Sequence, residues 1–452
     1  MDAEKPNRQS GTQILVLGGG FAGVYAVRRL EKLFAGRSDA RISVVSRDNF
    51  LLMTPLLFEV CSGKLEMSAC SISIREFLRR VEFIEASVEA IDLDRHVVLV
   101  SSGNTKQREL RYDHLVLALG SLTNTRRIEG SELAFTFKTL ADAILLRNYV
   151  IERMERAEVE SDPNIRRREL TLVVIGGGLV GVEVFGELTA FMDEVLRYYP
   201  RIRRAEIRLY LLEAGERIMP EIPESLASYS ARVLSSRVGV AIRTSTPVQR
   251  ITPGRVHLKD EVLEASTVIL SAGTTPSPLV AKLPLEKDAR GKILVEATMR
   301  CKQRPELWAV GDCASIPGPD GKPYPELAQH AMREARVVPE NIHAAVNGSA
   351  LKPFVYKTKG IMASLGYHRG IAAAMGIPFR GFLAWWIRRS YYLLVTPRMA
   401  QRIRLVVEWT IALFLYPPLS KLDLNTEQQM LRRHTDAEPL AGERPAAKPE
   451  PT

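Results

Sequence analysis

Short apolar runs alternate with amphipathic stretches along most of the chain. Apolar residues that follow one another without a break predict buried strands at 14–17, 41–46 and 306–312. Apolar residues at helical spacing predict a helix that ends near Phe34 and another over 137–160. Strands that alternate with helices in this way indicate an α/β protein with parallel sheets.

The strand–helix pattern starts again in the middle of the chain. A second unit begins at Leu170, and its second strand is expected at 206–213. The stretch 238–272 is interpreted as a β-meander that closes on a buried strand at 267–272. Residues 47–70 have no clean period and are expected to form a loop with a short helix.

Both units place glycines at the G-x-G-x-x-G spacing between a strand and a helix. The segments are ILVLGGGFAGVYAVRRL and LVVIGGGLVGVEVFGEL, with Gly18, Gly20 and Gly23 in the first and Gly176, Gly178 and Gly181 in the second. The first glycine of such a turn permits the tight bend, the second leaves room for a pyrophosphate, and the third lets helix and strand pack closely. The sequence therefore predicts two dinucleotide sites, and two such sites in one chain favour electron transfer from one dinucleotide to the other.

The end of each unit's second strand carries the residue that selects the ribose. An acid there binds the ribose hydroxyls and repels a 2′-phosphate. Glu213 holds this position in the second unit, which favours NADH over NADPH, although Arg217 lies four residues further on. The first unit has Ser46 instead, with Asp48 two residues later. Ser46 can still form a hydrogen bond with a ribose.

Composition and cysteine usage narrow the class of protein. Hydrophobic residues make up 46% of the chain and charged residues 25%, which is typical of a globular protein with a large core. The net charge of +10 favours an anionic partner. The four cysteines form no C-x-x-C pair, which disfavours a disulfide scaffold and thiol-based reductases: Cys61, Cys70, Cys301 and Cys313. The polar start of the chain is unlike a signal peptide, so we expect a protein on the cytosolic side.

Aromatic and basic residues are interleaved near the C-terminus. The segment 379–423 holds seven basic residues, two acids and three of the four tryptophans. Charges interrupt every apolar run, so its helices are expected to lie in a membrane interface rather than span it, with the aromatics at headgroup depth and the arginines on anionic lipid. The alternative is a pair of helices packed on the core. Nucleic-acid binding is disfavoured because no nucleic-acid module accompanies the segment.

The motifs together resemble those of the type II NADH dehydrogenases (NADH:quinone oxidoreductases). The resemblance spans about residues 12–423 and rests on GGGFAG, NFLLMTPLLFEV, GGGLVGVEVFGEL, VGDCA, ELAQHAMREA and YKTKGIMASLG through AWWIRRSYYLL. It implies an α/β fold of two Rossmann-like dinucleotide-binding domains, the second inserted in the first, followed by C-terminal amphipathic membrane-anchoring helices. It also implies tightly bound, non-covalent FAD, NADH as substrate, a membrane quinone as acceptor, and a peripheral respiratory-chain enzyme on the cytoplasmic face of the membrane, with a possible homodimer.

The resemblance assigns roles to individual residues. Glu183 is expected near the nicotinamide, Gln329 at the quinone and Lys359 near the flavin, and these three form the candidate catalytic set. The family's last quinone-motif glutamine is Arg333 here. The residues expected at the cofactors are Gly18, Gly20, Phe21, Ala22, Gly23, Ser46, Arg47, Thr54, Pro55, Gly120, Gly176, Gly178, Leu179, Val180, Gly181, Glu183, Glu213, Gly273, Gly311, Asp312, Ala328, Gln329 and Lys359, with no metal site. His330 and Glu183 are candidate proton donors to the quinol.

Domain bounds follow from the pattern along the chain together with this resemblance, and the expected tail follows from its Pro, Ala, Glu and Lys content. The expected order is a disordered lead (1–11), the FAD-binding domain in two parts (12–125 and 300–356), the NADH-binding domain (126–299), the membrane-anchoring region (357–423) and a disordered tail (424–452). Two alternatives stay open. One is a soluble NADH-dependent flavoprotein reductase of a protein acceptor, and the other is a non-catalytic NADH-sensing protein.

Overall fold

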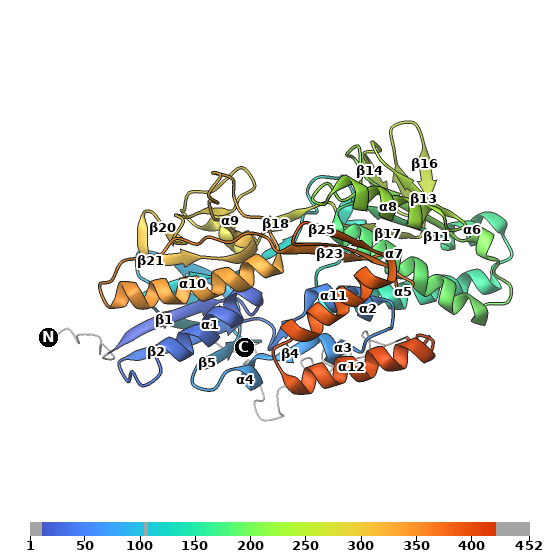
Figure 1. The fold of residues 1–452 in the computed structure, drawn as a ribbon. Coiled ribbons are helices and arrows are strands. Elements are labelled where there is room, and N and C mark those ends of the chain that lie inside the picture. The colour runs from blue at the N-terminus through green and yellow to red at the C-terminus, as the bar shows by residue number, and fades with distance from the viewer. Residues whose placement is uncertain (1–10, 104–106, 422–452) are drawn as a thin grey trace, which may run out of the picture. The chain divides into compact units, whose positions relative to one another are not determined.

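The structure is a computed structural model that describes residues 11–103 and 107–421. The predicted lead and tail lie outside this range, apart from Gly11. Two sheets organise the chain (Figure 1). The first has the order β20 (Arg300–Cys301), β21 (Arg304–Ala309), β9 (His114–Leu117), β1 (Thr12–Leu17), β2 (Ala40–Ser46) and β5 (Glu82–Glu85). All its neighbours are parallel except β20 and β21.

The second sheet is fully parallel. Its order is β13 (Val240–Arg243), β12 (Arg208–Leu212), β11 (Thr171–Ile175) and β17 (Thr267–Leu270). Every residue of β11 is buried, as expected for a central parallel strand with both faces covered. Because β13 belongs to this sheet, the predicted meander over 238–272 was wrong at its start. Only β14 (Arg250–Thr252), β15 (Arg255–His257) and β16 (Val262–Glu264) form that meander.

The helices predicted after the two glycine turns and over 137–160 are present, and the structure adds others. Helix α1 (Phe21–Leu33) follows the first glycine turn and packs along α10 (Ala328–Val346), as Figure 1 shows. Helix α7 (Leu179–Val195) follows the second turn. The remaining helices of the middle segment are α5 (Leu140–Val159), α6 (Pro163–Glu169), α8 (Glu224–Ser235) and α9 (Pro278–Lys282). Thr139 caps α5: its side chain accepts a hydrogen bond from the amide of Asp142, and the Asp142 side chain accepts one from the amide of Thr139.

Two short strands join the sheets. The segment 114–121 (HLVLALGS) leads into β10 (Ser121–Thr123), and the segment 268–277 (VILSAGTTPS) contains β18 (Thr274–Pro276). These two strands pair antiparallel. Residues 47–77 contain more structure than predicted: β3 (Phe50–Leu52), α2 (Leu57–Cys61), α3 (Met67–Cys70), β4 (Ser71–Ser73) and α4 (Ile74–Phe77). Other small sheets are β6 (Ser87–Asp92), β7 (Val97–Ser101) and β8 (Arg108–Arg111), and the pair β19 (Ile293–Leu294) and β22 (Ala314–Ser315).

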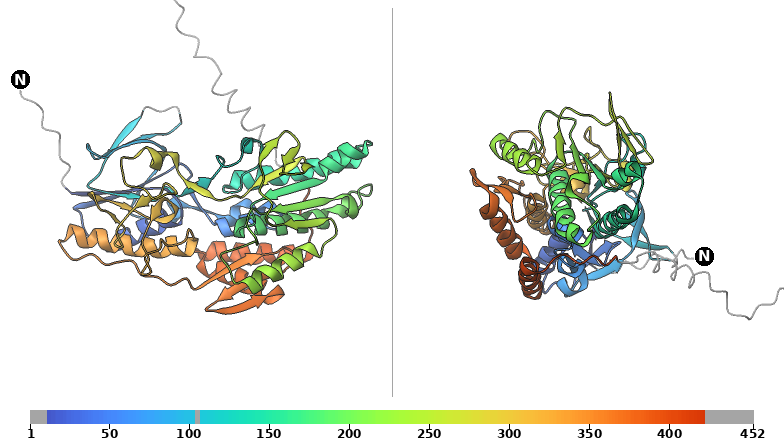
Figure 2. Two further views of the ribbon diagram at one scale, coloured as in Figure 1. Left: turned by 90° about the horizontal axis from the view of Figure 1, so that it is seen from above. Right: turned by 90° about the vertical axis from the view of Figure 1, so that its right-hand side faces the viewer.

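The C-terminal segment adds a small sheet that the sequence did not predict. Strands β23 (Gly360–Ser364), β24 (Gly370–Ala374) and β25 (Ile377–Arg380) pair antiparallel and contact α11 (Gly381–Val395). Helix α12 (Met399–Phe414) follows. Both views in Figure 2 show this orange-to-red segment along the outside of the unit that ends at Pro417. No helix in the described ranges has both the length and the apolar content needed to cross a bilayer. The domain bounds drawn from the sequence stay a prediction.

Candidate functional site

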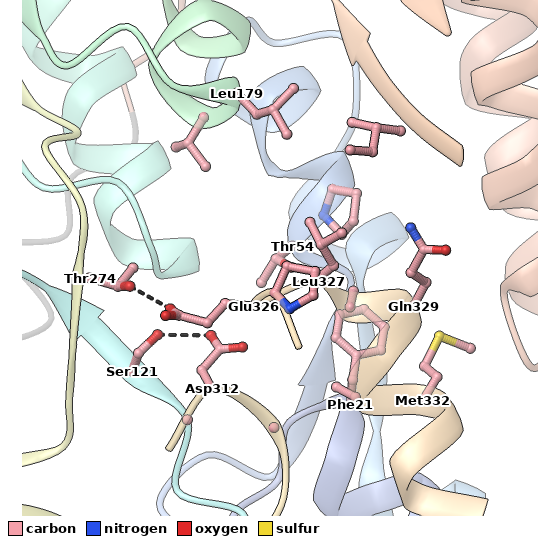
Figure 3. Close-up of a pocket in the computed structure, with 18 of the residues that line it drawn as sticks. Phe21, Thr54, Ser121, Leu179, Thr274, Asp312, Glu326, Leu327, Gln329 and Met332 are labelled. Atoms are coloured by element: carbon pink, nitrogen blue, oxygen red, sulfur yellow. Dashed lines mark hydrogen bonds between the residues drawn. The ribbon is translucent and has the colours of Figure 1, made fainter. Parts of the chain in front are cut away.

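One cavity of about 1320 Å³ is lined by both glycine turns. Gly20, Phe21 and Ala22 contribute from the first turn, and Gly178, Leu179 and Val180 from the second. Figure 3 shows Leu179 on one side of this space and Phe21, Asp312 and Gln329 on the other. The other predicted residues that line it are Thr54, Pro55, Gly120, Glu183, Gly273, Gly311, Ala328 and Lys359. The fold therefore brings the two sites predicted from separate motifs into one space.

The first turn has the geometry that a dinucleotide phosphate requires. Gly18 adopts φ +119°, and a Cβ there would lie 2.1 Å from the carbonyl oxygen of Ala118. A Cβ on Gly23 would lie 1.9 Å from the carbonyl oxygen of Gly18, so α1 can approach β1 only without a side chain. A Cβ on Gly20 would meet nothing within 4 Å. The open space over Gly20 and the N-terminus of α1 fit the pyrophosphate of FAD.

The second turn repeats this division of roles. Gly176 has φ +105°, and a Cβ there would lie 2.5 Å from the carbonyl oxygen of Ser271. A Cβ on Gly181 would lie 1.9 Å from the oxygen of Gly176. A Cβ on Gly178 would have only one neighbour within 4 Å, an oxygen of Glu221 at 3.7 Å. The face of Gly178 is thus open toward the same cavity, as a second dinucleotide requires.

The strand-end residues lie behind the turns. Glu213 accepts hydrogen bonds from the amides of Gly177 (2.6 Å) and Gly215 (2.7 Å). Ser46 is buried beside Gly19, and Arg47 forms an exposed ion pair with Asp48. Glu213, Ser46 and Arg47 are not among the described residues that line the cavity. Their contact with a ribose stays a prediction.

Asp312 follows β21, where the sequence placed it, and faces the cavity. Its Oδ2 accepts a hydrogen bond from the Ser121 hydroxyl (2.8 Å) and pairs with the Lys138 ammonium (3.3 Å). Figure 3 shows the Ser121 contact beside a second one, in which the Thr274 hydroxyl donates to Glu326. Ser121 and Thr274 belong to the paired strands β10 and β18. The strands that join the two sheets therefore carry polar groups into the cavity next to Asp312.

Gln329 fixes the loop that leads to β23. Its Nε2 donates to the carbonyl of Gly360 (2.8 Å), and its Oε1 accepts from the Tyr356 hydroxyl (3.1 Å) and the Lys359 amide (3.4 Å). Lys359 itself is exposed and lines the cavity. Two tyrosines of α11, Tyr391 and Tyr392, line the same space. The cavity thus extends from the glycine turns to the C-terminal helices.

Glu183 lies on α7 and is buried where it lines the cavity. Its Oε1 accepts from the amide of Ser364 (2.9 Å) and pairs with Nη2 of Arg388 (3.1 Å). This approach needs Gly186, where a Cβ would lie 2.8 Å from the backbone of Leu365. Burial raises the pKa of the Glu183 carboxyl to about 7, against the opposing effect of Arg388. Glu183 is therefore not a solvated residue on the surface of its helix.

His330 is packed inside the protein beside the cavity. Its Nε2 contacts the Thr358 hydroxyl at 2.9 Å, its ring packs against Tyr324 and Tyr356, and the side chain is buried. It is not among the described residues that line the cavity, although its neighbours Gln329 and Ala331 are. Burial also lowers its pKa. His330 is thus a buried helix histidine, and proton donation to the quinol by His330 or Glu183 stays a prediction.

The C-terminal helices differ in part from the prediction. Arg388 and Arg389 were expected on anionic lipid but are buried in ion pairs with Glu59. Trp385 and Trp409 were expected at headgroup depth but are buried as well. The sequence alone places these arginines on the outer surface, because their partner Glu59 is about 330 residues away in the chain. The outer faces of both helices nevertheless expose large apolar side chains: Phe382, Leu383, Trp386, Leu394, Met399, Ile403, Val406, Val407, Ile411 and Phe414.

Thiol chemistry does not fit the cysteines. All four are free and buried. Burial raises the pKa of each thiol, to about 12 for Cys70 and Cys301 and to about 11 for Cys313. The thiolate is the reactive form, so these groups are unsuited to redox work. The sequence-based exclusion of thiol reductases and the geometry agree.

The comparisons with known proteins come from sequence and from structure. The family model described as pyridine nucleotide-disulphide oxidoreductase matches residues 12–335. A probable NADH dehydrogenase of Dictyostelium discoideum is 30% identical, with 88% of each chain covered. A type II NADH:quinone oxidoreductase of Staphylococcus aureus is 28% identical, over 84% of this chain and 94% of that protein.

A solved structure supports the same fold. NDH2 from Plasmodium falciparum in complex with NADH superposes with a TM-score of 0.82, at 19% identity, over 91% of this chain and all of that chain. At that identity the match shows the fold alone. The chain therefore belongs to the pyridine nucleotide-disulphide oxidoreductase family, and the resemblance to type II NADH dehydrogenases that its motifs indicated is confirmed.

Proposed function

We propose that the protein is a non-proton-pumping NADH:quinone oxidoreductase that passes a hydride from NADH to FAD and then two electrons to a membrane quinone. The observation that carries this proposal is the single cavity lined by both glycine turns. Dinucleotides bound at the two turns would extend into the same space. FAD, when bound, supplies the two-electron chemistry, and the protein supplies binding, orientation and electrostatics.

The chain's own residues divide the binding work. The turn at Gly20 and the N-terminus of α1 would hold the FAD pyrophosphate, and Asp312 would bind a polar part of the cofactor. The turn at Gly178 would hold NADH. Glu213 disfavours NADPH because a carboxylate repels a 2′-phosphate. The relatives named as NADH dehydrogenases support this assignment.

The quinone end of the cavity is formed by Gln329, Lys359 and the tyrosines of α11. Reduction of a quinone to a quinol consumes protons as well as electrons. The Glu183 carboxyl can hold and release a proton near neutral pH, because its pKa is raised to about 7. Arg333 also lines this end and adds a positive charge to the cavity, at the position where the family motif implied by the resemblance has a glutamine.

The acceptor is reached from the bilayer. Exposed apolar side chains follow helical spacing on α12, at Met399, Ile403, Val407, Ile411 and Phe414, while Leu405 and Trp409 are buried on the inner face. A helix of this kind lies in the interface plane. The proposal includes a peripheral position on the cytoplasmic face of the membrane and a homodimer as a possible assembly. A soluble reductase of a protein acceptor would not need this apolar face.

Flotation on anionic liposomes that contain a quinone tests the proposal. Deletion of 379–452 is a poor test, because it would leave the buried Glu59 without its arginines. Ile403→Glu and Ile411→Glu change exposed positions instead. We expect the double variant to leave the liposomes and to lose oxidation of NADH by the membrane quinone, with reduction of a soluble quinone retained. The matched control Val238→Glu changes an exposed valine elsewhere and should float like the native protein. A double variant that floats and works normally contradicts the membrane part of the proposal.

A further inference from the structure

Arg388 joins three parts of the molecule through one guanidinium group. Its Nη1 pairs with Glu59 Oε1 on α2 (3.1 Å). Its Nη2 pairs with Glu183 Oε1 on α7 (3.1 Å) and donates to the carbonyl of Pro55 (2.5 Å). Pro55 and Glu183 both line the cavity, and Arg388 itself lies on α11. The C-terminal helix is therefore in direct contact with the carboxyl that we assign to proton transfer.

Glu59 connects the same contact to α12. Its Oε2 accepts from Arg389 Nη2 (2.9 Å) and from the indole nitrogen of Trp409 (2.8 Å). The Arg389 guanidinium also lies over the rings of Trp385 and Trp409. Arg388, Arg389 and Glu59 are all buried, so these charges are screened little by solvent. A change in how α11 and α12 pack would therefore alter the field at Glu183.

Charged groups from several elements surround the contact between Arg388 and Glu183. The charged and titratable groups that face Glu183 and its partners come from α2, the loop after it, α7, the β23–β24 region, the segment after α8, and α11: Glu59, Lys64, Glu187, Glu194, His368, Arg237, Arg388, Arg389 and Tyr392. The ion pairs form two sets: Arg388 and Arg389 pair with Glu59 and Glu183, and Lys64 pairs with Glu187 and Glu194. Within the first set, Glu59 and Glu183 share the positive charge of Arg388, so a change in either partner alters the field at Glu183.

We propose that Arg388 is a positioning residue for proton transfer, which orients Glu183 toward the cavity and sets its proton affinity from the C-terminal helices. The inference deepens the proposed function and rests on it for the role of the proton. Arg388 touches neither glycine turn and does not line the cavity in the described chain. It acts through Glu183. Glu59 has the opposite effect on the proton affinity of Glu183, because the negative charge of Glu59 offsets part of the positive charge of Arg388.

Substitutions of Arg388 and of Glu59 should shift the titration midpoint of Glu183 in opposite directions. Arg388→Gln removes a cation at 3.1 Å and should raise the titration midpoint of Glu183 by about one to three pH units. Glu59→Gln removes a competing anion and should lower the midpoint. Arg388→Lys keeps the charge and should stay within about half a unit of the native midpoint.

Infrared spectroscopy reads this midpoint without turnover. The band of the protonated carboxyl is titrated with pH and assigned to Glu183 by its loss in Glu183→Gln. The pH midpoint of flavin reoxidation by a soluble quinone should shift in the same direction for each variant. Thermal unfolding checks that the variants fold. If Arg388→Gln does not fold, Glu59→Gln and Arg388→Lys still decide the question.

The outcomes test the positioning role of Arg388 separately from the proposed quinone reductase function. Opposite shifts for Arg388→Gln and Glu59→Gln, with Arg388→Lys near native, support the positioning role. Equal midpoints in all folded variants, or shifts in one direction only, overturn it and leave a structural role for Arg388. If the native protein is not reoxidised by quinone, the proposed function fails, while the infrared titration still decides whether Arg388 controls Glu183.

Discussion

The carboxylate of Glu213 accepts a hydrogen bond from the amide of Gly177 at 2.6 Å. The residue predicted to select the ribose thus also holds the second glycine turn in place. Its second oxygen accepts from Gly215. A ribose that binds Glu213 would share these oxygens, each of which can accept more than one hydrogen bond. Cofactor choice and the shape of the turn therefore depend on one carboxylate.

Glu213→Gln should relax the preference for NADH. The amide oxygen can still accept from Gly177, but the charge that repels a 2′-phosphate is gone. We expect the ratio of kcat/KM for NADPH to that for NADH to rise about tenfold, which corresponds to about 1.4 kcal/mol. Glu216→Gln, an exposed acid three residues away, should leave the ratio unchanged. An unchanged ratio in Glu213→Gln would refute the role of this carboxylate.

Valine at Gly20 or Gly178 should separate the two cofactor sites. Both glycines have ordinary negative φ and open space around them, so each variant should fold. Gly20→Val fills the space assigned to FAD and should give a colourless protein. Gly178→Val should stay yellow, with its reduction by NADH slowed at least tenfold. Each variant serves as the control for the other, and the visible spectrum reports both results. The reverse pattern would exchange the two assignments.

Glu183 should make stability depend on pH. Its pKa is raised from 4.5 to about 7 in the folded protein, so the folded state holds the proton more tightly than the unfolded chain. Below about pH 4.5 the Glu183 carboxyl is protonated in both states and does not lower the free energy of unfolding. The free energy of unfolding then falls as the pH rises toward about 7. Glu183→Gln should remove a penalty of roughly 3 kcal/mol above that pH, since one pKa unit is about 1.4 kcal/mol.

The measurement compares thermal unfolding of both proteins from acid to neutral pH. The two stability curves should diverge as the pH rises, in favour of Glu183→Gln. Parallel curves would mean that the carboxyl titrates normally. In the enzyme assay the same variant should lose the pH midpoint near 7 in flavin reoxidation by quinone, with reduction by NADH less affected.

Gln329→Ala should impair the quinone step. The change removes the hydrogen bonds to Gly360 and Tyr356 that fix the loop around Lys359. We expect the KM for a soluble quinone to rise at least fivefold, with bleaching by NADH unchanged in an anaerobic mixing experiment. Lys357→Ala changes an exposed residue of the same loop and should behave as native. Slower bleaching by NADH in Gln329→Ala would place Gln329 at the other half-reaction.

The glycine turns were predictable because their geometry is encoded locally. A strand, three glycines and a helix within about 17 residues determine where the backbone must bend, and the structure places Gly18 and Gly176 at positive φ. The meeting of both turns in one cavity followed from the duplicated unit. Phe21 lines that cavity as the first residue of the helix after the first turn, and Asp312 lines it at the end of the predicted strand 306–312, whereas Gln329 was expected there from the family resemblance.

The parts that sequence reasoning missed depend on distant partners. Arg388 looks like a surface arginine until Glu59 is placed beside it, and no local pattern brings the two together. Ser364 ends the strand Gly360–Ser364, and the following strand, GIAAA, lacks the β-branched residues that usually signal a strand. Residue type alone makes His330 a candidate proton donor, whereas the orientation of its ring depends on packing against Tyr324 and Tyr356.

The visible spectrum of the purified protein tests the central claim most directly. The account predicts a yellow protein that bleaches when NADH is added without oxygen and regains its colour when a soluble quinone follows. A protein that stays colourless when FAD is supplied would contradict the first dinucleotide site. A yellow protein that NADH does not bleach would contradict transfer between the two sites and would favour an NADH-sensing role.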